Sequence, residues 1–95
     1  MIIRILLGDD HAIVRQGLRQ VLALMPELEL VAEAKNGWEV LEGVRTHAPD
    51  LLLLDLNMPG PSGAELIKRV REEAPRLPIL VFSMHGESQI AGRAI

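Results

Sequence analysis

Three aspartates stand shortly after apolar runs, a position that places carboxylates at the end of a buried strand. Asp9 and Asp10 follow the run Ile2–Leu7, and Asp55 comes directly after the run Leu51–Leu54. Open α/β sheets bind ligands at the carboxyl ends of neighbouring strands, so these acids are candidates for one shared site. Carboxylates that lie close together repel one another unless a cation joins them, and an all-oxygen donor set favours Mg²⁺.

Two further residues suit phosphoryl chemistry beside such a cation. Asn57 stands two residues after Asp55, where its backbone carbonyl can complete the coordination of Mg²⁺. Ser83 ends the apolar run Pro78–Ser83, and its hydroxyl can donate a hydrogen bond to an incoming phosphoryl oxygen. An aspartate can itself be the nucleophile that accepts a phosphoryl group, in a transfer that depends mostly on positioning and charge neutralisation. Asp55 is therefore the candidate phosphoacceptor.

The histidines near these acids are expected to be peripheral. His11 and His85 flank the candidate site, but no cysteine or second histidine stands at the spacing of a zinc site. Trp38 is expected to pack against its neighbours in the fold.

Apolar strand-like runs alternate with segments of helical periodicity along the whole chain. The expected strands are Ile2–Leu7, Leu28–Ala34, Leu51–Asp55 and Pro78–Ser83, and the expected helices are His11–Met25, one from Asn36 to before Pro49, one from Ser62 to before Pro75, and a last one beginning in Glu87–Ile95. Such alternation predicts a single α/β domain with a parallel sheet and right-handed crossovers. The flavodoxin-like order 2-1-3-4, with Leu28–Ala34 at an edge, places the three aspartates together.

Local signals indicate how the helices begin and which faces they bury. Asp10 is expected to cap the helix His11–Met25, in which Arg15, Arg19 and Gln20 face away. The apolar face of this helix consists of Val14, Leu18, Val21, Leu22 and Met25.

The next two helices begin with capping-box signals. Asn36 with Glu39, and Ser62 with Glu65, have the three-residue spacing of this motif.

Composition narrows the function classes. The 95 residues are 48% hydrophobic and carry 10 basic and 13 acidic side chains, so the net charge of −3 disfavours nucleic-acid binding by this chain. The sequence has no cysteine, which excludes disulfides and thiol chemistry. No apolar run approaches the roughly 20 residues of a membrane span, and we expect a cytoplasmic protein.

The set D-D-H near the start, D-L-N-M-P-G in the middle and S-M-H after the fourth run resembles the receiver domain of two-component response regulators, of the kind that precedes a LuxR-type helix-turn-helix output domain. The resemblance implies that Asp55 is phosphorylated by a histidine kinase and that Mg²⁺ is held by Asp9, Asp10, Asp55 and the backbone of Asn57. It also implies that Ser83 is the switch hydroxyl, that the surface around helix four changes on phosphorylation, and that the output domain binds DNA to regulate transcription.

The chain departs from this family in its last part. Receivers have a fifth strand with a lysine, followed by a fifth helix, and nothing after Ile95 supplies them. We therefore expect residues 1–95 to be an incomplete receiver domain. An open edge at the fourth strand would favour a homodimer or a domain-swapped dimer.

Two alternative functions remain open at this point. The chain could be a non-signalling interaction fragment that dimerises through its open edge. It could also be a Mg²⁺-dependent aspartyl phosphohydrolase, but such enzymes usually need a second acid two residues after the nucleophile, where this chain has Asn57. A regulatory phosphoacceptor without enzymatic turnover is the expected function.

Overall fold

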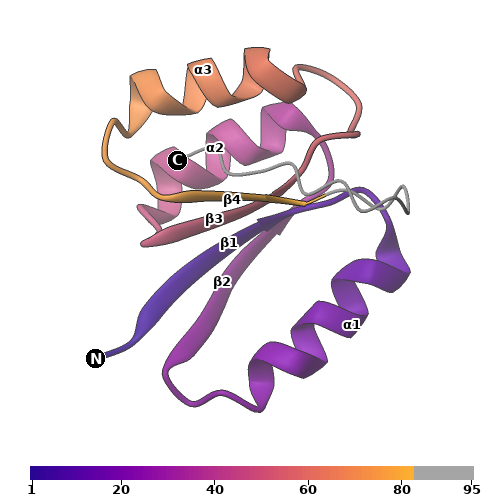
Figure 1. Ribbon diagram of the computed structural model, residues 1–95, viewed down its shortest axis with the longest axis vertical. Coiled ribbons are helices and arrows are strands. Elements are labelled where there is room, and N and C mark those ends of the chain that lie inside the picture. The colour runs from indigo at the N-terminus through magenta and orange to yellow at the C-terminus, as the bar shows by residue number, and fades with distance from the viewer. Residues whose placement is uncertain (83–95) are drawn as a thin grey trace.

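The computed structural model describes residues 1–82 and has three α-helices and four parallel strands in that part of the chain (Figure 1). The strands are β1 (Ile3–Gly8), β2 (Leu28–Ala34), β3 (Leu51–Asp55) and β4 (Ile79–Phe82). The helices are α1 (Ala12–Ala23), α2 (Gly37–His47) and α3 (Gly63–Glu73). The strand order is β2-β1-β3-β4, which confirms the predicted fold and places β2 at an edge. Ser83, His85 and the helix expected within 87–95 lie outside the described residues.

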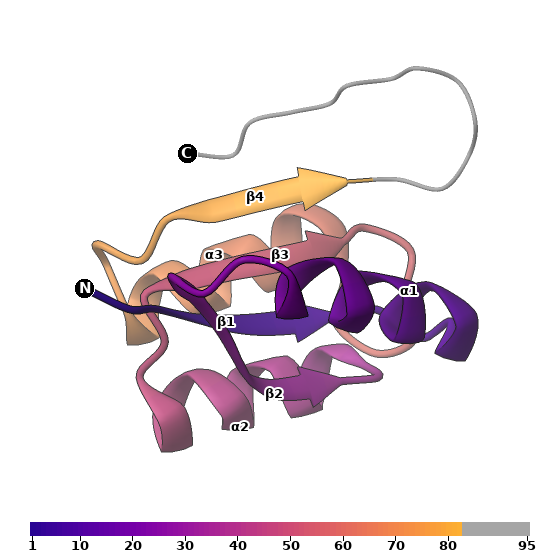
Figure 2. The same cartoon turned by 90° about the horizontal axis from the view of Figure 1, so that it is seen from below.

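Helices lie on both faces of the sheet. In Figure 2, α1 lies in front of the strands, and α2 and α3 lie behind them. The main hydrophobic core fills the space between the sheet and the pair α2 and α3, where Leu6, Leu52, Leu54, Leu66 and Val70 are fully buried. Each such side chain contributes about 1.5–3 kcal/mol by leaving water, so this aliphatic core holds the strands that carry the acids.

The register of the strands brings the predicted acids together. Gly8 at the end of β1 lies opposite Leu54 in the parallel ladder. The next residue, Asp9, therefore meets the end of β3 at Asp55. Asp55 in turn lies opposite Phe82 of β4, so it stands at the carboxyl edge between two neighbours.

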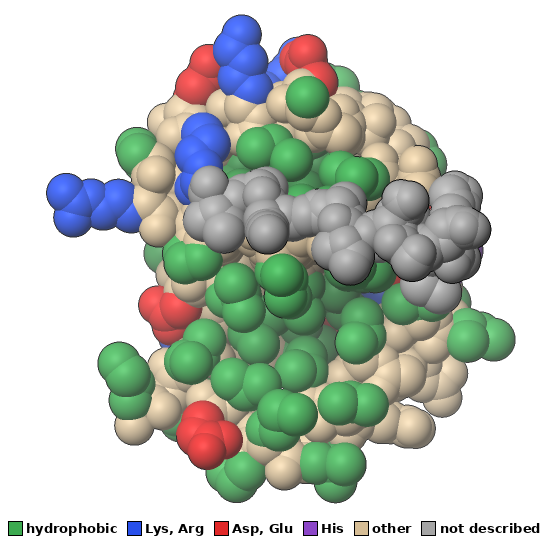
Figure 3. Space-filling view, viewed as in Figure 1, with side chains coloured by type: hydrophobic (Ala, Val, Ile, Leu, Met, Phe, Trp, Pro, Cys, Tyr) green, Lys and Arg blue, Asp and Glu red, His purple; other side chains and the backbone are tan. Residues whose placement is uncertain are grey.

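The helix α1 buries less of its surface than its pattern predicted. Leu22 is its only buried residue and Val14 is partly buried, whereas Val21 and Met25 are 48% and 43% exposed. Of the strands, α1 packs chiefly against the edge strand β2, so much of its apolar face does not meet the centre of the sheet. Figure 3 shows hydrophobic side chains gathered on the surface between α1 and β4. The prediction that Arg15 faces away is wrong, because its side chain is 15% exposed and contacts two strand ends.

The starts of α1 and α2 differ in how well the capping signals predicted them. Asp10 is not the N-cap of α1: His11 occupies that position without a side-chain cap, and the Asp10 carboxylate lies 3.2 Å from the His11 ring instead. Asn36 does cap α2, since its Oδ1 accepts the Glu39 N–H at 2.9 Å. The Glu39 carboxylate accepts the N–H of Lys35 at 2.8 Å, one residue earlier than a capping box places it.

The capping box predicted for α3 does not form. Ser62 is the N-cap residue of α3 but makes no side-chain cap hydrogen bond. The Glu65 carboxylate pairs with Arg69 at 2.9 Å, one helical turn later, in place of the helix start. The Arg69 guanidinium in turn lies 5.4 Å from the ring centre of Trp38, which links α3 to α2 at the surface.

Ala48→Gly should stabilise the fold by about 1 kcal/mol. Ala48 follows α2 with φ 44° and ψ 60°, a left-handed conformation in which a side chain crowds the backbone and glycine does not. The measurement is the free energy of unfolding in urea. As a matched control, Ala64→Gly on the exposed surface of α3 should cost about 1 kcal/mol. A loss of stability in Ala48→Gly would contradict the conformation of this turn.

Candidate functional site

Three aspartates and one histidine meet at the carboxyl ends of β1 and β3. One potential ligand atom from each of Asp9, Asp10, His11 and Asp55 lies within 4.8 Å of the others. Asp9 and Asp55 are 0% and 1% exposed, whereas the Asp10 side chain is 32% exposed. The structure thus brings together the three carboxylates that the sequence predicted as neighbours.

The two carboxylate oxygens of Asp9 differ in their hydrogen bonding. Its Oδ1 accepts the backbone N–H of His11 at 2.9 Å and lies 2.9 Å from Nδ1 of the same residue. Its Oδ2 is buried and accepts no hydrogen bond from the described residues. A buried carboxylate oxygen without a donor is costly, so this oxygen is a natural ligand for a cation.

The two carboxylate oxygens of Asp55 differ in the same way. Oδ1 accepts the backbone N–H of Asn57 at 3.1 Å, and Oδ2 is buried without a hydrogen-bond partner among the described residues. Burial raises the pKa of the Asp55 carboxyl above its ordinary value of 3.8; the Asn57 N–H lowers it, and the Asp9 carboxylate raises it further. The carboxylate of Asp55, the candidate phosphoacceptor, is therefore desolvated, and a nearby positive charge would stabilise its ionised form.

The donor set fits a hard divalent cation. Three carboxylates supply oxygen ligands, and the two orphaned oxygens of Asp9 and Asp55 belong to the same cluster. Mg²⁺ binds one or two carboxylates, keeps several waters and leaves room for a phosphate group. The Asn57 carbonyl remains a predicted ligand, and the predicted switch hydroxyl of Ser83 lies outside the described residues.

His11 is not peripheral, contrary to the prediction. Its Nδ1 lies 2.9 Å from Asp9 Oδ1, 3.2 Å from Asp10 Oδ1 and 3.7 Å from Asp55 Oδ2. The hydrogen bond with Asp9 raises the pKa of His11, and the Asp10 carboxylate adds to this effect. The direct adjacency of Asp9, Asp10 and His11 in the sequence is a signal for this contact, which the spacing of zinc ligands does not capture.

Arg15 supports the site from α1, and its role was also missed. Its Nη1 donates to the backbone carbonyl of Asp9 at 2.8 Å, while its Nε pairs with Glu33 of β2 at 3.1 Å. Arg19 reaches the other oxygen of Glu33 at 3.0 Å. These contacts fix the turn that carries Asp9 to the end of the neighbouring strand. Arg15 stands one helical turn after His11, where a cation can reach the strand-end acids.

The loop between β3 and α3 rests on the start of α2. The Gly37 N–H donates to the Pro59 carbonyl at 3.0 Å, and an added Cβ on Gly37 would lie only 2.0 Å from the Pro61 carbonyl oxygen. Gly60, with φ 83°, lies against Trp38. Position 37 therefore requires glycine, because a side chain there would prevent the close approach that positions the loop after Asp55.

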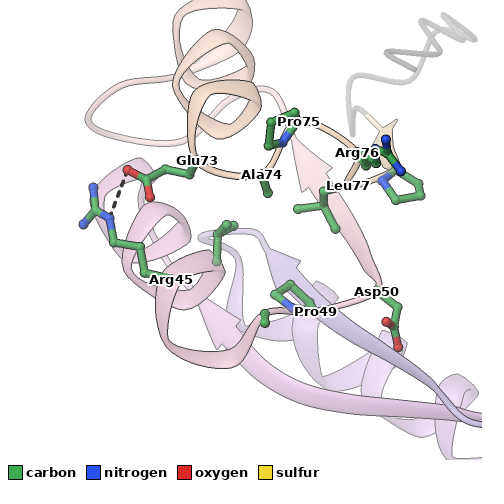
Figure 4. Close-up of a pocket in the computed structure, with 11 residues that line it drawn as sticks. Arg45, Pro49, Asp50, Glu73, Ala74, Pro75, Arg76 and Leu77 are labelled. Carbon is green, nitrogen blue, oxygen red and sulfur yellow. Dashed lines mark ion pairs between the residues drawn. The ribbon is translucent and has the colours of Figure 1, made fainter.

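A separate cavity lies at the opposite edge of the sheet. It measures about 790 Å³ and lies between the ends of α2 and α3 and the segments that precede β3 and β4. Figure 4 shows Pro49, Asp50 and Leu77 around it, with the ion pair between Arg45 and Glu73 at 3.2 Å on its rim. The carboxylate cluster, rather than this cavity, carries the candidate chemistry.

In the absence of divalent cations, Asp55→Asn should raise the free energy of unfolding at neutral pH by about 1–2 kcal/mol, because it removes a buried charge beside Asp9. In the folded chain the pKa of Asp55 is raised above its ordinary value of 3.8. The destabilisation caused by its buried charge is therefore absent below pH 3.8 and complete above the raised pKa. The gain should therefore disappear as the pH falls through this window. Urea unfolding in a chelator at several pH values measures it. Equal or lower stability of the variant at neutral pH would contradict the burial of this charge.

The family to which the chain belongs also has an acidic site at this place. The family model described as the response regulator receiver domain matches residues 5–95. The chain belongs to this family. Receiver domains are not a conventional enzyme family, and the acidic cluster of Asp9, Asp10 and Asp55 is typical of their Mg²⁺ site.

Relatives of this receiver include regulators of transcription. The nitrate/nitrite response regulator protein NarL of Escherichia coli strain K12 is 48% identical over 56 residues, which are 59% of this chain and 26% of NarL. The transcriptional regulatory protein DegU of Brevibacillus brevis is 42% identical over 57 residues, 60% of this chain and 24% of DegU. The match thus spans about a quarter of these curated relatives.

Solved structures share the fold of this receiver over most of its length. A LuxR-family two-component response regulator from Aurantimonas sp. SI85-9A1 has a TM-score of 0.83 at 39% identity, covering 90% of this chain and 61% of that one. The response regulator domain of Thermotoga maritima CheB has a TM-score of 0.85 at 31% identity, covering 96% of this chain and 67% of that one.

Among the residues that the structure describes, no helix is long and apolar enough to cross a membrane.

Proposed function

We propose that this chain is the receiver of a NarL-type response regulator and that it accepts a phosphoryl group from a histidine kinase on Asp55, with Mg²⁺ bound beside it. The observation that carries the proposal is a pair of buried carboxylate oxygens in one acidic cluster, Asp9 Oδ2 and Asp55 Oδ2, which have no hydrogen-bond partner among residues 1–82. The family membership and the place of the cluster at the carboxyl edge of the sheet support it.

Each residue of the cluster has a distinct role in this proposal. Asp9, Asp10, Asp55 and the backbone carbonyl of Asn57 would hold Mg²⁺, which supplies positive charge to a phosphoryl group when it is bound. The Asn57 N–H donates to Oδ1 of Asp55 at 3.1 Å and so fixes the orientation of the carboxylate that attacks the phosphoryl group. An oxygen–phosphorus bond forms at Asp55 while the phosphorus–nitrogen bond of the kinase phosphohistidine breaks, and the imidazole leaves with the electron pair. The Ser83 hydroxyl would donate to the transferred group.

The residue at position 57 favours a long-lived phosphoryl group over rapid turnover. A hydrolase with an aspartyl nucleophile usually uses an acid there to move protons, and the amide of Asn57 cannot do so. The receiver would therefore act as a switch rather than as a phosphatase, with slow self-dephosphorylation at most.

The proposed partners follow from the family. Phosphorylation would change the surface around the fourth helix and so control an output domain on the same full-length protein, which binds DNA and regulates transcription in the cytoplasm. The residues 1–95 would be its receiver portion. Dimerisation, including a swapped form through the edge at β4, would couple two such chains.

Intact mass after incubation with acetyl phosphate tests this function. The full-length product of the reading frame should gain one phosphoryl group in the presence of Mg²⁺ and none in a chelator. Asp55→Asn should gain none, whereas Asp50→Asn, a control at the opposite edge of the sheet, should be labelled like the wild type. Labelling of Asp55→Asn at the wild-type level would overturn the assignment.

A further inference from the structure

We infer that His11 is a nitrogen ligand of the proposed cation site, so that this receiver binds later divalent transition ions such as Co²⁺, besides Mg²⁺, with the help of an imidazole. The inference rests on the proposed metal site and deepens it by naming the ion class. An all-oxygen site of Asp9, Asp10, Asp55 and a backbone carbonyl would favour these ions less, because it lacks the imidazole nitrogen.

The distances within the cluster suit one octahedral ion. With metal–ligand distances of about 2.1 Å, neighbouring ligands are about 3.0 Å apart and opposite ligands about 4.2 Å apart. Nδ1 of His11 lies 2.9, 3.2 and 3.7 Å from one oxygen each of Asp9, Asp10 and Asp55. The 2.9 Å contact is a hydrogen bond to Asp9 Oδ1, and an ion bound by Nδ1 would replace its proton. All four side chains offer a ligand atom within 4.8 Å of the others, so the imidazole lies beside the place where one ion would meet the three carboxylates.

The buried oxygens are the independent sign that this cluster receives a ligand. Asp55 Oδ2 has no hydrogen-bond partner among the described residues, and it lies 3.7 Å from Nδ1 of His11. The Asp55 side chain is 1% exposed, whereas the His11 side chain is 53% exposed. The imidazole therefore forms the outer side of a cluster whose inner side is two buried carboxylates.

The chemistry of the donors sets the expected preference. Mg²⁺ favours oxygen ligands and exchanges its waters reluctantly, so an imidazole adds little to its binding. Later divalent ions of the first transition row bind imidazole well, with affinity rising from Mn²⁺ through Co²⁺ to Ni²⁺. Removal of the His11 ring should therefore weaken Co²⁺ binding selectively and leave Mg²⁺ binding close to that of the wild type.

Titration calorimetry with Mg²⁺ and with Co²⁺ tests the inference on the wild type, His11→Ala and the control His47→Ala. His47 ends α2 and is no member of the cluster. In His11→Ala, the dissociation constant for Co²⁺ should rise by about tenfold or more, because a direct ligand should contribute at least as much as the outer-shell partners whose loss costs about 10–100-fold. The Mg²⁺ constant should change by less than about twofold, and His47→Ala should match the wild type.

Pulsed electron paramagnetic resonance of bound Mn²⁺ gives a direct readout of the ligand. The wild type should show modulation from a directly bound ¹⁴N nucleus, and His11→Ala should lose it. Unchanged Co²⁺ binding in His11→Ala, or a spectrum without nitrogen in the wild type, would overturn the inference while Mg²⁺ binding leaves the proposed function intact. Failure of every ion to bind the wild type would overturn both.

Discussion

Mg²⁺ at about one hundred times its dissociation constant should raise the free energy of unfolding of the wild type by about 2.7 kcal/mol. The gain follows because the ion binds the folded chain, where Asp9 Oδ2 and Asp55 Oδ2 are buried and have no hydrogen-bond partner in the described part of the chain. In Asp9→Asn, a 10–100-fold weaker site should reduce the gain at the same concentration to about 0.4–1.4 kcal/mol. Urea unfolding with Mg²⁺ and with a chelator measures both values.

The control for this result is an acid away from the cluster. Asp50 lies before β3, where its carboxylate accepts the Arg4 N–H at 2.9 Å, so Asp50→Asn should retain the full gain from Mg²⁺. A wild type that gains no stability from Mg²⁺, or an Asp9→Asn variant that gains as much as the wild type, would contradict the metal site.

Gly37→Ala should destabilise the fold by about 1–3 kcal/mol and weaken Mg²⁺ binding as well. The new Cβ would lie 2.0 Å from the backbone oxygen of Pro61, and a backbone atom cannot turn away as a flexible side chain can. The loop must move, which breaks the hydrogen bond from Gly37 to Pro59 and shifts the segment that carries Asn57. Urea unfolding and Mg²⁺ titration of the same samples measure the two effects.

Gly17→Ala is a matched control for this prediction. Gly17 lies within α1, and no atom of residues 1–82 that could clash lies within 4 Å of a Cβ added there. The substitution should therefore stabilise the chain by about 0.4–1 kcal/mol, through helix propensity and a less flexible unfolded state. A gain of stability in both Gly37→Ala and Gly17→Ala would contradict the close contact between α2 and the loop that follows β3.

The sequence predicted the elements and the acidic cluster because local chemistry determines them. Apolar runs of strand length alternate with helical periods and end at proline or glycine, so the order of elements could be predicted from residues close in sequence. The parallel topology then places Asp9, Asp10 and Asp55 together, since strand ends on one edge meet.

Contacts between distant residues explain what the sequence did not predict. Asp10 was expected to cap α1, but its carboxylate lies toward the His11 ring within the acidic cluster. Arg15 was placed on the solvent side by its helical position, yet Asp9 and Glu33 provide partners for it. Periodicity describes which face is apolar, whereas these polar contacts depend on the strand ends that the fold brings to the helix.

The most direct test of the account is to locate the phosphoryl group after labelling with acetyl phosphate and Mg²⁺. Borohydride reduces an acyl phosphate to an alcohol and leaves free carboxylates unchanged, so a phosphorylated aspartate is converted into homoserine. Peptide mass spectrometry of the reduced protein should find homoserine at position 55, in the segment LLLLDLNMPG, and aspartate at positions 9 and 10. Homoserine at another position, or labelled protein with an intact Asp55, would contradict the central claim.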